Sequence, residues 1–211
     1  MGEDLSGNGN DAALDDVTLA EGPFGVRDTA YRFHGRATSY GRISSSSSMN
    51  VGHNGSFTFT AFIRTDLKMV PFLEYRGDNG YGLHIWAYPS EKLYINVMSG
   101  VTRTSNFNNV MDVSVNDWHF VGVSYDINAQ TLMGVVDENS EVVPGFVVTR
   151  AATEGDAYLG LRVGSPGLLG EMSCVMLFSV GLSLDDVQRV KEYCGKHLKP
   201  RGKKKINIKK F

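Results

Sequence analysis

Apolar and polar residues alternate along most of the chain, with the two-residue period of β-strands that bury one face. The clearest case begins at Phe57, where every second residue through Ile63 is apolar and Thr58, Thr60 and Arg64 lie on the other face. Similar runs predict strands at 31–33, 70–75, 81–88, 93–97, 121–125, 132–136, 142–148, 158–163 and 172–178. Because no helical pattern separates these runs, parallel βαβ units are excluded and antiparallel pairing is expected.

Turn-forming residues support this reading. Gly77-Asp78-Asn79-Gly80 separates two of the predicted strands, and its Asn-Gly pair is a strong hairpin signal. The run Ser44–Ser48 is too short for a linker and is expected to form a surface loop between two strands.

A helical pattern is present near the C-terminus. Ser183 is a suitable N-cap, and Asp186 fits the capping box three residues later. The predicted apolar stripe contains Leu184, Val187, Val190 and Cys194, and Gly195 is expected to end the helix. The sequence therefore predicts an all-β protein, an antiparallel two-sheet β-sandwich with one short C-terminal helix.

Composition fits one globular domain with a basic tail. The 211 residues suffice for one sizeable sandwich, and no apolar run approaches the roughly 20 residues that a membrane span requires, so no membrane insertion is expected. Eight of the 21 basic residues lie from Lys196 onward, whereas all 23 acidic residues precede it. The acidic body argues against nucleic-acid binding. The tail, residues 196–211, is either a solvated linker or a contact for anionic glycans or lipids.

The two cysteines, Cys174 and Cys194, are expected to form a disulfide. The apolar stripe of the helix must lie on the sheet, which brings Cys194 close to the strand that contains Cys174. Two independent buried thiols are the alternative.

Three stretches, taken in order, carry a family resemblance. DLSGNGND at Asp4–Asp11 resembles the entry loop of laminin-G-like and pentraxin-like jelly rolls, and the Trp118-His119 start of the segment 116–126 resembles their central strand. Residues 170–187 are similar to their closing strand and short helix. The resemblance covers Asp4 to about Cys194 and implies a concanavalin A-like jelly roll over residues 1–195. The turn Asp137-Glu138-Asn139 departs from the usual Asp-Gly, and Cys174 occupies a position that is commonly polar.

The first candidate site is a calcium site in the entry loop. Asp4, Asn8, Asn10 and Asp11 offer the oxygen ligands that calcium prefers, and related modules often carry calcium. The alternative is a turn whose Asp and Asn side chains bond nearby backbone amides.

Ligand-binding candidates gather around the predicted hairpin. Arg76-Gly77-Asp78 matches an integrin-type adhesion tripeptide, although glycine and aspartate are also ordinary turn residues. His84 and Trp86 share one strand face, where exposed rings would stack on a sugar and buried rings would belong to the core. The candidate ligand-binding residues are Arg76, Asp78, Asn79, Tyr81, His84 and Trp86.

Asn54-Gly55-Ser56 is an N-glycosylation sequon at a predicted surface turn. Catalytic signals are weak: no Glu-x-Asp-x-x-Glu run of the glucanase type appears, nor a Ser-His-Asp pattern or zinc-ligand spacing.

These observations lead to an expected function. The chain is expected to be an extracellular or cell-surface module of a larger protein that binds a glycan or an extracellular protein without catalysis. The alternatives are a structural spacer domain and an atypical glycan hydrolase.

Overall fold

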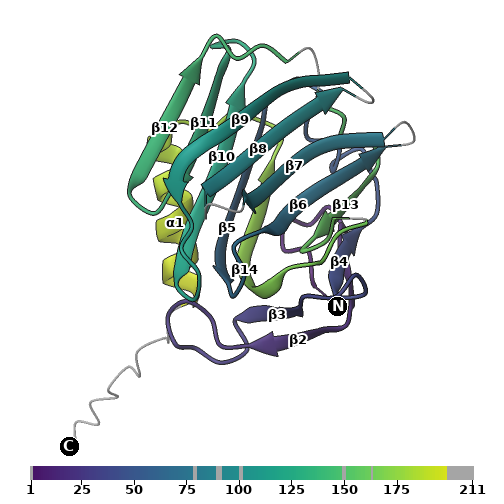
Figure 1. Ribbon diagram of the computed structural model, residues 1–211, viewed down its shortest axis with the longest axis vertical. Coiled ribbons are helices and arrows are strands. Elements are labelled where there is room, and N and C mark those ends of the chain that lie inside the picture. Colours follow the sequence, from purple (N-terminus) through teal and green to yellow (C-terminus); the bar gives the residue numbers. More distant parts are fainter. Residues whose placement is uncertain are drawn as a thin grey trace, which may run out of the picture.

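The protein is a sandwich of two antiparallel seven-stranded sheets, as the sequence predicts (Figure 1). The computed structural model describes residues 2–77, 80–88, 92–99, 102–148, 151–162 and 164–198. The first sheet has the order β1 (Ala12–Asp15), β4 (Tyr40–Ile43), β13 (Asp156–Leu159), β6 (Val70–Gly77), β7 (Gly80–Tyr88), β8 (Lys92–Ser99) and β9 (Thr102–Asp112). The second has the order β12 (Asn139–Pro144), β11 (Thr131–Val136), β10 (Trp118–Asp126), β5 (Phe57–Thr65), β14 (Leu169–Phe178), β3 (Ala30–His34) and β2 (Val17–Ala20).

Strand β5 explains why both faces of the second sheet are apolar at its centre. Phe57, Phe59 and Ile63 are fully buried between the sheets, in the main core. Phe62, on the opposite face, belongs to a second cluster together with Phe120 of the neighbouring strand β10. Since apolar surface is buried on both faces here, β5 carries three consecutive apolar residues at 61–63.

The second cluster is covered by α1 (Leu184–Leu198), which lies against the outer face of the second sheet (Figure 1). Ser183 caps the helix as predicted: the backbone N–H of Asp186 donates to its Oγ at 3.2 Å, and Oγ donates to the Asp186 carboxylate at 2.6 Å. Trp118 packs partly buried in this second cluster.

The predicted end of the helix at Gly195 is wrong, because α1 continues to Leu198. Gly195 is buried inside the helix, and a Cβ at this position would lie 3.6 Å from the ring of Phe24. This distance is an ordinary van der Waals contact, so Gly195 is an interior residue of the helix and does not act as a C-cap.

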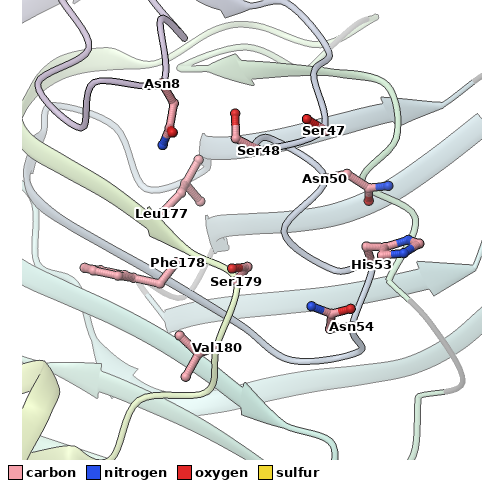
Figure 2. A pocket seen from close by; sticks show the side chains of 10 residues that line it. All are labelled: Asn8, Ser47, Ser48, Asn50, His53, Asn54, Leu177, Phe178, Ser179 and Val180. Carbon is pink, nitrogen blue, oxygen red and sulfur yellow. The ribbon is translucent and has the colours of Figure 1, made fainter.

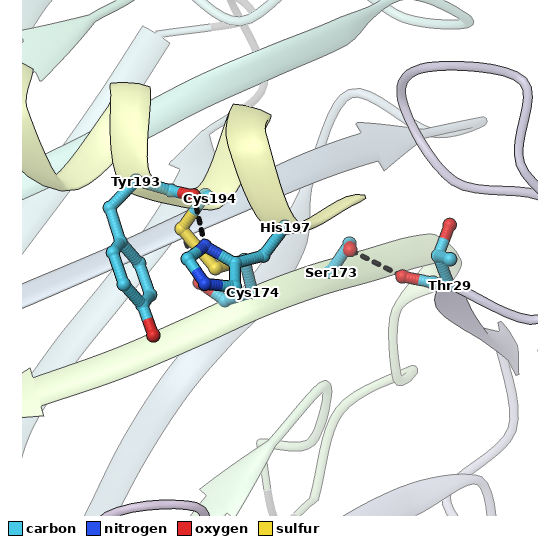
Figure 3. The surroundings of a disulfide bond; sticks show 6 residues. All are labelled: Thr29, Ser173, Cys174, Tyr193, Cys194 and His197. Atoms are coloured by element: carbon cyan, nitrogen blue, oxygen red, sulfur yellow. Dashed lines mark hydrogen bonds between the residues drawn. A yellow bond between two sulfur atoms is a disulfide. The ribbon is translucent and has the colours of Figure 1, made fainter. Parts of the chain in front are cut away.

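The disulfide prediction is confirmed: Cys174 of β14 is bonded to Cys194 of α1, with their Cα atoms 6.0 Å apart (Figure 3). Cys174 has a φ of 48° and lies within the irregular stretch of β14 between Ser173 and Met176. The bond fastens the last helix to the sheet that it covers.

Some strands were not predicted. Strands β1, β2 and β4 are only four residues long, and β9 is rich in serine, threonine and asparagine, so none has a long apolar alternation. The predicted strands 142–148 and 158–163 lie earlier in the chain, at Asn139–Pro144 and Asp156–Leu159. The predicted hairpin is confirmed by the pairing of Gly77 with Gly80, and no helix among the described residues is long and apolar enough to cross a membrane.

Candidate functional site

A pocket of about 370 Å³ opens at one rim of the sandwich (Figure 2). Three segments form its walls: the entry loop, the connection between β4 and β5, and the end of β14 with the residues that follow it. The ten described residues that line it are Asn8, Ser47, Ser48, Asn50, His53, Asn54, Leu177, Phe178, Ser179 and Val180.

The β4–β5 connection, which contains the predicted serine loop, is fastened to the core. The Tyr75 hydroxyl donates to the carbonyl of Met49 at 2.8 Å, and burial raises the pKa of this hydroxyl. The hydroxyl of buried Thr153 donates to Asn50 Oδ1 at 2.7 Å and accepts the backbone N–H of Gly52 at 2.8 Å. A Cβ on Gly52 would lie only 2.7 Å from the carbonyl oxygen of Ala151, so the close approach of these two backbone segments requires glycine at position 52.

The entry loop is fastened to the serine loop through Asn10. Its Oδ1 accepts the hydroxyl of Ser46 at 2.8 Å, and its Nδ2 donates to the hydroxyl of Ser48 at 3.0 Å. These bonds link two walls of the pocket and place Asn8 at its edge (Figure 2).

The third wall is anchored by Thr58 of β5. Its hydroxyl donates to the carbonyl of Val180 at 2.7 Å and accepts the backbone N–H of Leu182 at 3.0 Å. The carbonyl of Leu182 also accepts the hydroxyl of Ser124 at 2.8 Å. Each of the three walls is thus held by hydrogen bonds to another part of the fold.

Two of the predicted calcium ligands, Asp4 and Asp11, accept hydrogen bonds within the entry loop. Asp4 accepts the backbone N–H of Ser6 at 2.8 Å, the Ser6 hydroxyl at 2.9 Å and the backbone N–H of Asn10 at 2.9 Å. These bonds, that from Asn10 first, lower the pKa of Asp4. Asp11 Oδ1 accepts the backbone N–H of Asp4 at 2.8 Å.

This bonding favours the turn alternative, since a calcium ion would have to displace N–H and O–H donors from Asp4. Among the residues that the structure describes, no group of three or more His, Cys, Asp or Glu side chains is placed to hold a metal. Calcium binding by the entry loop stays a prediction.

The predicted sugar-binding rings are buried. His84 and Trp86 are only 3% and 5% exposed, and the Arg162 guanidinium lies 4.2 Å from the centre of the Trp86 ring. They lie on the face of the first sheet that points away from the main core, whereas Leu83 and Ile85 of the same strand face it. Burial favours the packing alternative for both rings.

His84 and Arg76 flank the buried carboxylate of Glu74. Arg76 Nε donates to Glu74 Oε1 at 2.8 Å, and His84 Nδ1 lies 3.9 Å from Oε2. Burial, followed by the charges of Arg162 and Arg76, lowers the pKa of His84 to about 4 despite this carboxylate. Of the other hairpin candidates, Asp78 and Asn79 and the side chain of Tyr81 lie outside the described residues.

A Ser-His-Asp arrangement that the sequence pattern did not reveal lies elsewhere. Ser114 Oγ is 2.9 Å from His119 Nε2, and His119 Nδ1 is 2.6 Å from Asp137 Oδ2. The three residues come from the β9–β10 loop, the start of β10 and the turn after β11, so only the fold brings them together. None of the three residues lines the rim pocket. Asp137 also accepts the backbone N–H of Phe120 at 2.9 Å, which indicates that these side chains stabilise the turn rather than perform catalysis.

The sequon lies on the pocket wall. Asn54 is exposed in a turn, and its side chain lines the pocket (Figure 2). Ser56 Oγ accepts the backbone N–H of Ile127 at 3.1 Å, which holds the sequon against the next loop. The pocket itself could not be predicted from the sequence, because Asn8, Asn54 and Ser179 are far apart in the chain and carry no shared motif.

The fold is a two-sheet β-sandwich with a pocket at its rim. The Laminin_G_3 family model, described as the concanavalin A-like lectin/glucanases superfamily, matches residues 35–188. This chain therefore belongs to that superfamily, which confirms the resemblance seen in its motifs. A comparison with curated protein sequences found no match.

Solved structures show the same fold at low sequence identity. The binding domain of botulinum neurotoxin serotype G matches with a TM-score of 0.65 and 11% identity, covering 92% of this chain and 48% of the toxin domain. A structure of botulinum neurotoxin type C, whose cell entry depends on interaction with two ganglioside molecules, matches with a TM-score of 0.66 and 13% identity. The match covers 90% of this chain and 48% of the toxin chain. Domains LG4-5 of the mouse laminin alpha1 chain match with a TM-score of 0.60 and 17% identity, covering 82% of this chain and 47% of the laminin chain. This chain spans about half the length of these structures.

Proposed function

We propose that this domain is a non-catalytic recognition module of an extracellular or cell-surface protein, and that it binds a glycan or a protein at the rim pocket. The observation that carries the proposal is the pocket itself: a preformed, polar concavity whose three walls are each held by hydrogen bonds to another part of the fold. Its volume lies at the low end of the roughly 300–1,000 Å³ usual for ligand sites.

Two further observations support the proposal. The structural neighbours include laminin LG domains and neurotoxin structures, one of a toxin whose cell entry depends on two ganglioside molecules and one of a binding domain in complex with rat synaptotagmin II. The Cys174–Cys194 disulfide suits an oxidising compartment such as the extracellular space.

The test is a binding screen of the purified domain against a glycan array and a panel of extracellular matrix proteins at moderate salt. Specific binding that substitutions in the pocket weaken supports the proposal. The screen is repeated with a variant lacking residues 199–211, because the basic tail is itself expected to attract anionic glycans. Absence of binding in both screens would instead favour the structural spacer.

A further inference from the structure

The chemistry of the rim pocket narrows its ligand class. Among the ten described residues that line it, none is Asp, Glu, Lys or Arg, and His53 is the sole ionisable side chain. The polar lining consists of amide and hydroxyl groups at three asparagines and three serines. Each of these groups both donates and accepts hydrogen bonds.

We propose that the pocket binds an uncharged saccharide, an inference that rests on the function proposed above. Sugar hydroxyls also donate and accept, so the amides and hydroxyls of the pocket match them in kind. Leu177 and Val180 add apolar surface beside these groups, which suits the C–H faces of a sugar ring. The volume of about 370 Å³ restricts the buried part of the ligand to one or two sugar residues.

The absence of a lining cation excludes acidic sugars as the preferred ligands. A carboxylate or sulfate that leaves water needs a paired positive charge, and the described lining residues supply no Lys or Arg. Residues 1–195 carry ten more acidic than basic side chains, so the body of the domain also repels anions. An acidic glycan that binds this protein is therefore expected at the basic tail, with strong salt dependence.

The experiment compares neutral glycans with sialylated and sulfated glycans on one array, using the full chain and two pocket variants. His53→Ala removes an exposed ring that lines the pocket, and His197→Ala, which alters an exposed ring on α1, is the matched control. We expect His53→Ala to weaken neutral-glycan binding roughly fivefold, as for the loss of one hydrogen bond, and the control to leave it unchanged. Ser47→Lys places a cation in the pocket and should create binding of acidic glycans there.

Each outcome bears on one of the two proposals. Neutral binding that His53→Ala weakens, together with acidic binding gained by Ser47→Lys, supports the saccharide assignment. Binding of acidic glycans alone, or neutral binding that His53→Ala leaves intact, overturns it while the recognition function stands. Capture of a matrix protein that His53→Ala weakens, without glycan binding, also overturns it. A domain that binds no glycan and no protein refutes both proposals, provided that thermal unfolding shows every variant to be folded.

Discussion

His119 and Asp137 share a hydrogen bond of 2.6 Å that joins the start of β10 to the turn between β11 and β12. Asp137 has a φ of 56°, a conformation that aspartate tolerates better than most residues. Its second oxygen accepts the backbone N–H of Phe120, and its own N–H donates to the carbonyl of Phe120. The departure from the family turn is thus compensated by a side chain that fastens the turn to β10.

This pair predicts a pH-dependent contribution to stability. The hydrogen bond that His119 donates to the Asp137 carboxylate raises the pKa of His119 above 6.5, so the stabilisation is complete below that pH and is lost as pH rises through the folded-state pKa. Burial raises the pKa of Asp137, but its hydrogen bonds with His119 and the Phe120 N–H, together with the charges of His119 and Lys191, lower this pKa below 3.8. The stabilisation from Asp137 is therefore lost as pH falls through its folded-state pKa. We expect His119→Gln to lower the melting temperature more at pH 6 than at pH 8.5. Thermal unfolding of both proteins at both pH values measures this, and an equal loss at the two pH values would contradict it.

The disulfide is expected to contribute to the stability of the native state. It closes a loop with a sequence separation of 20, for which chain-entropy estimates give roughly 3 kcal/mol. The variant Cys174→Ala/Cys194→Ala should therefore melt about 6–12 °C lower than the wild type. Reductant should lower the melting temperature of the wild type alone; an effect of similar size on the variant would show that the loss has another origin.

The main features of the fold were predictable because they depend on local patterns. A few neighbouring residues suffice to predict the strand at Phe57–Ile63, the Asn-Gly hairpin and the helix cap at Ser183. The prediction failed at Gly195, which looks like a helix end in isolation, whereas α1 continues through it to Leu198 with Gly195 buried beside Phe24.

The candidate site was less predictable, for a physical reason. Asn10 was expected as a calcium ligand because its chemistry suits one, yet its amide bonds Ser46 and Ser48, more than 30 residues away. His84 and Trp86 alternate as surface residues do, and only the fold shows that Arg162 lies over Trp86. The sequence shows which chemistry each residue type permits, whereas the fold determines which residues each side chain contacts.

The entry loop gives opposite predictions for its two interpretations. Because Asp4 accepts three hydrogen bonds from the loop itself, we expect millimolar calcium and chelator to leave the melting temperature unchanged. Asp4→Ala should lower it modestly in either medium. A calcium-dependent rise in the melting temperature that Asp4→Ala abolishes would establish the calcium site and reject the self-bonded turn.

Burial of His84 predicts acid sensitivity. Its pKa is lowered to about 4, so the unfolded chain binds more protons than the native state between that pH and 6.5, and stability falls as pH decreases across this window. The loss should approach roughly 3 kcal/mol near pH 4. His84→Gln should show a shallower decrease than the wild type in urea unfolding from pH 6.5 to 4.5. Parallel decreases would assign the acid sensitivity to other groups.

Glycosylation of Asn54 is expected to block the rim pocket. The sequon places its acceptor amide on the pocket wall, so an attached glycan would occupy or cover the space that a ligand needs. Protein from a secretory host that glycosylates Asn54 should bind the ligand of the pocket at least tenfold more weakly than unglycosylated protein. Mass spectrometry of the intact chain reports whether the site is occupied.

Two substitutions separate the effect of the glycan from that of the side chain. Ser56→Ala removes the sequon but keeps the Asn54 amide, at the cost of the bond from the Ile127 N–H, and should restore binding to protein from the secretory host. Asn54→Gln also removes the glycan but alters the amide in the pocket, so it should restore binding only in part. If fully glycosylated protein binds as tightly as the Ser56→Ala variant, the ligand does not occupy this pocket, and the recognition surface has to be sought on another face of the sandwich.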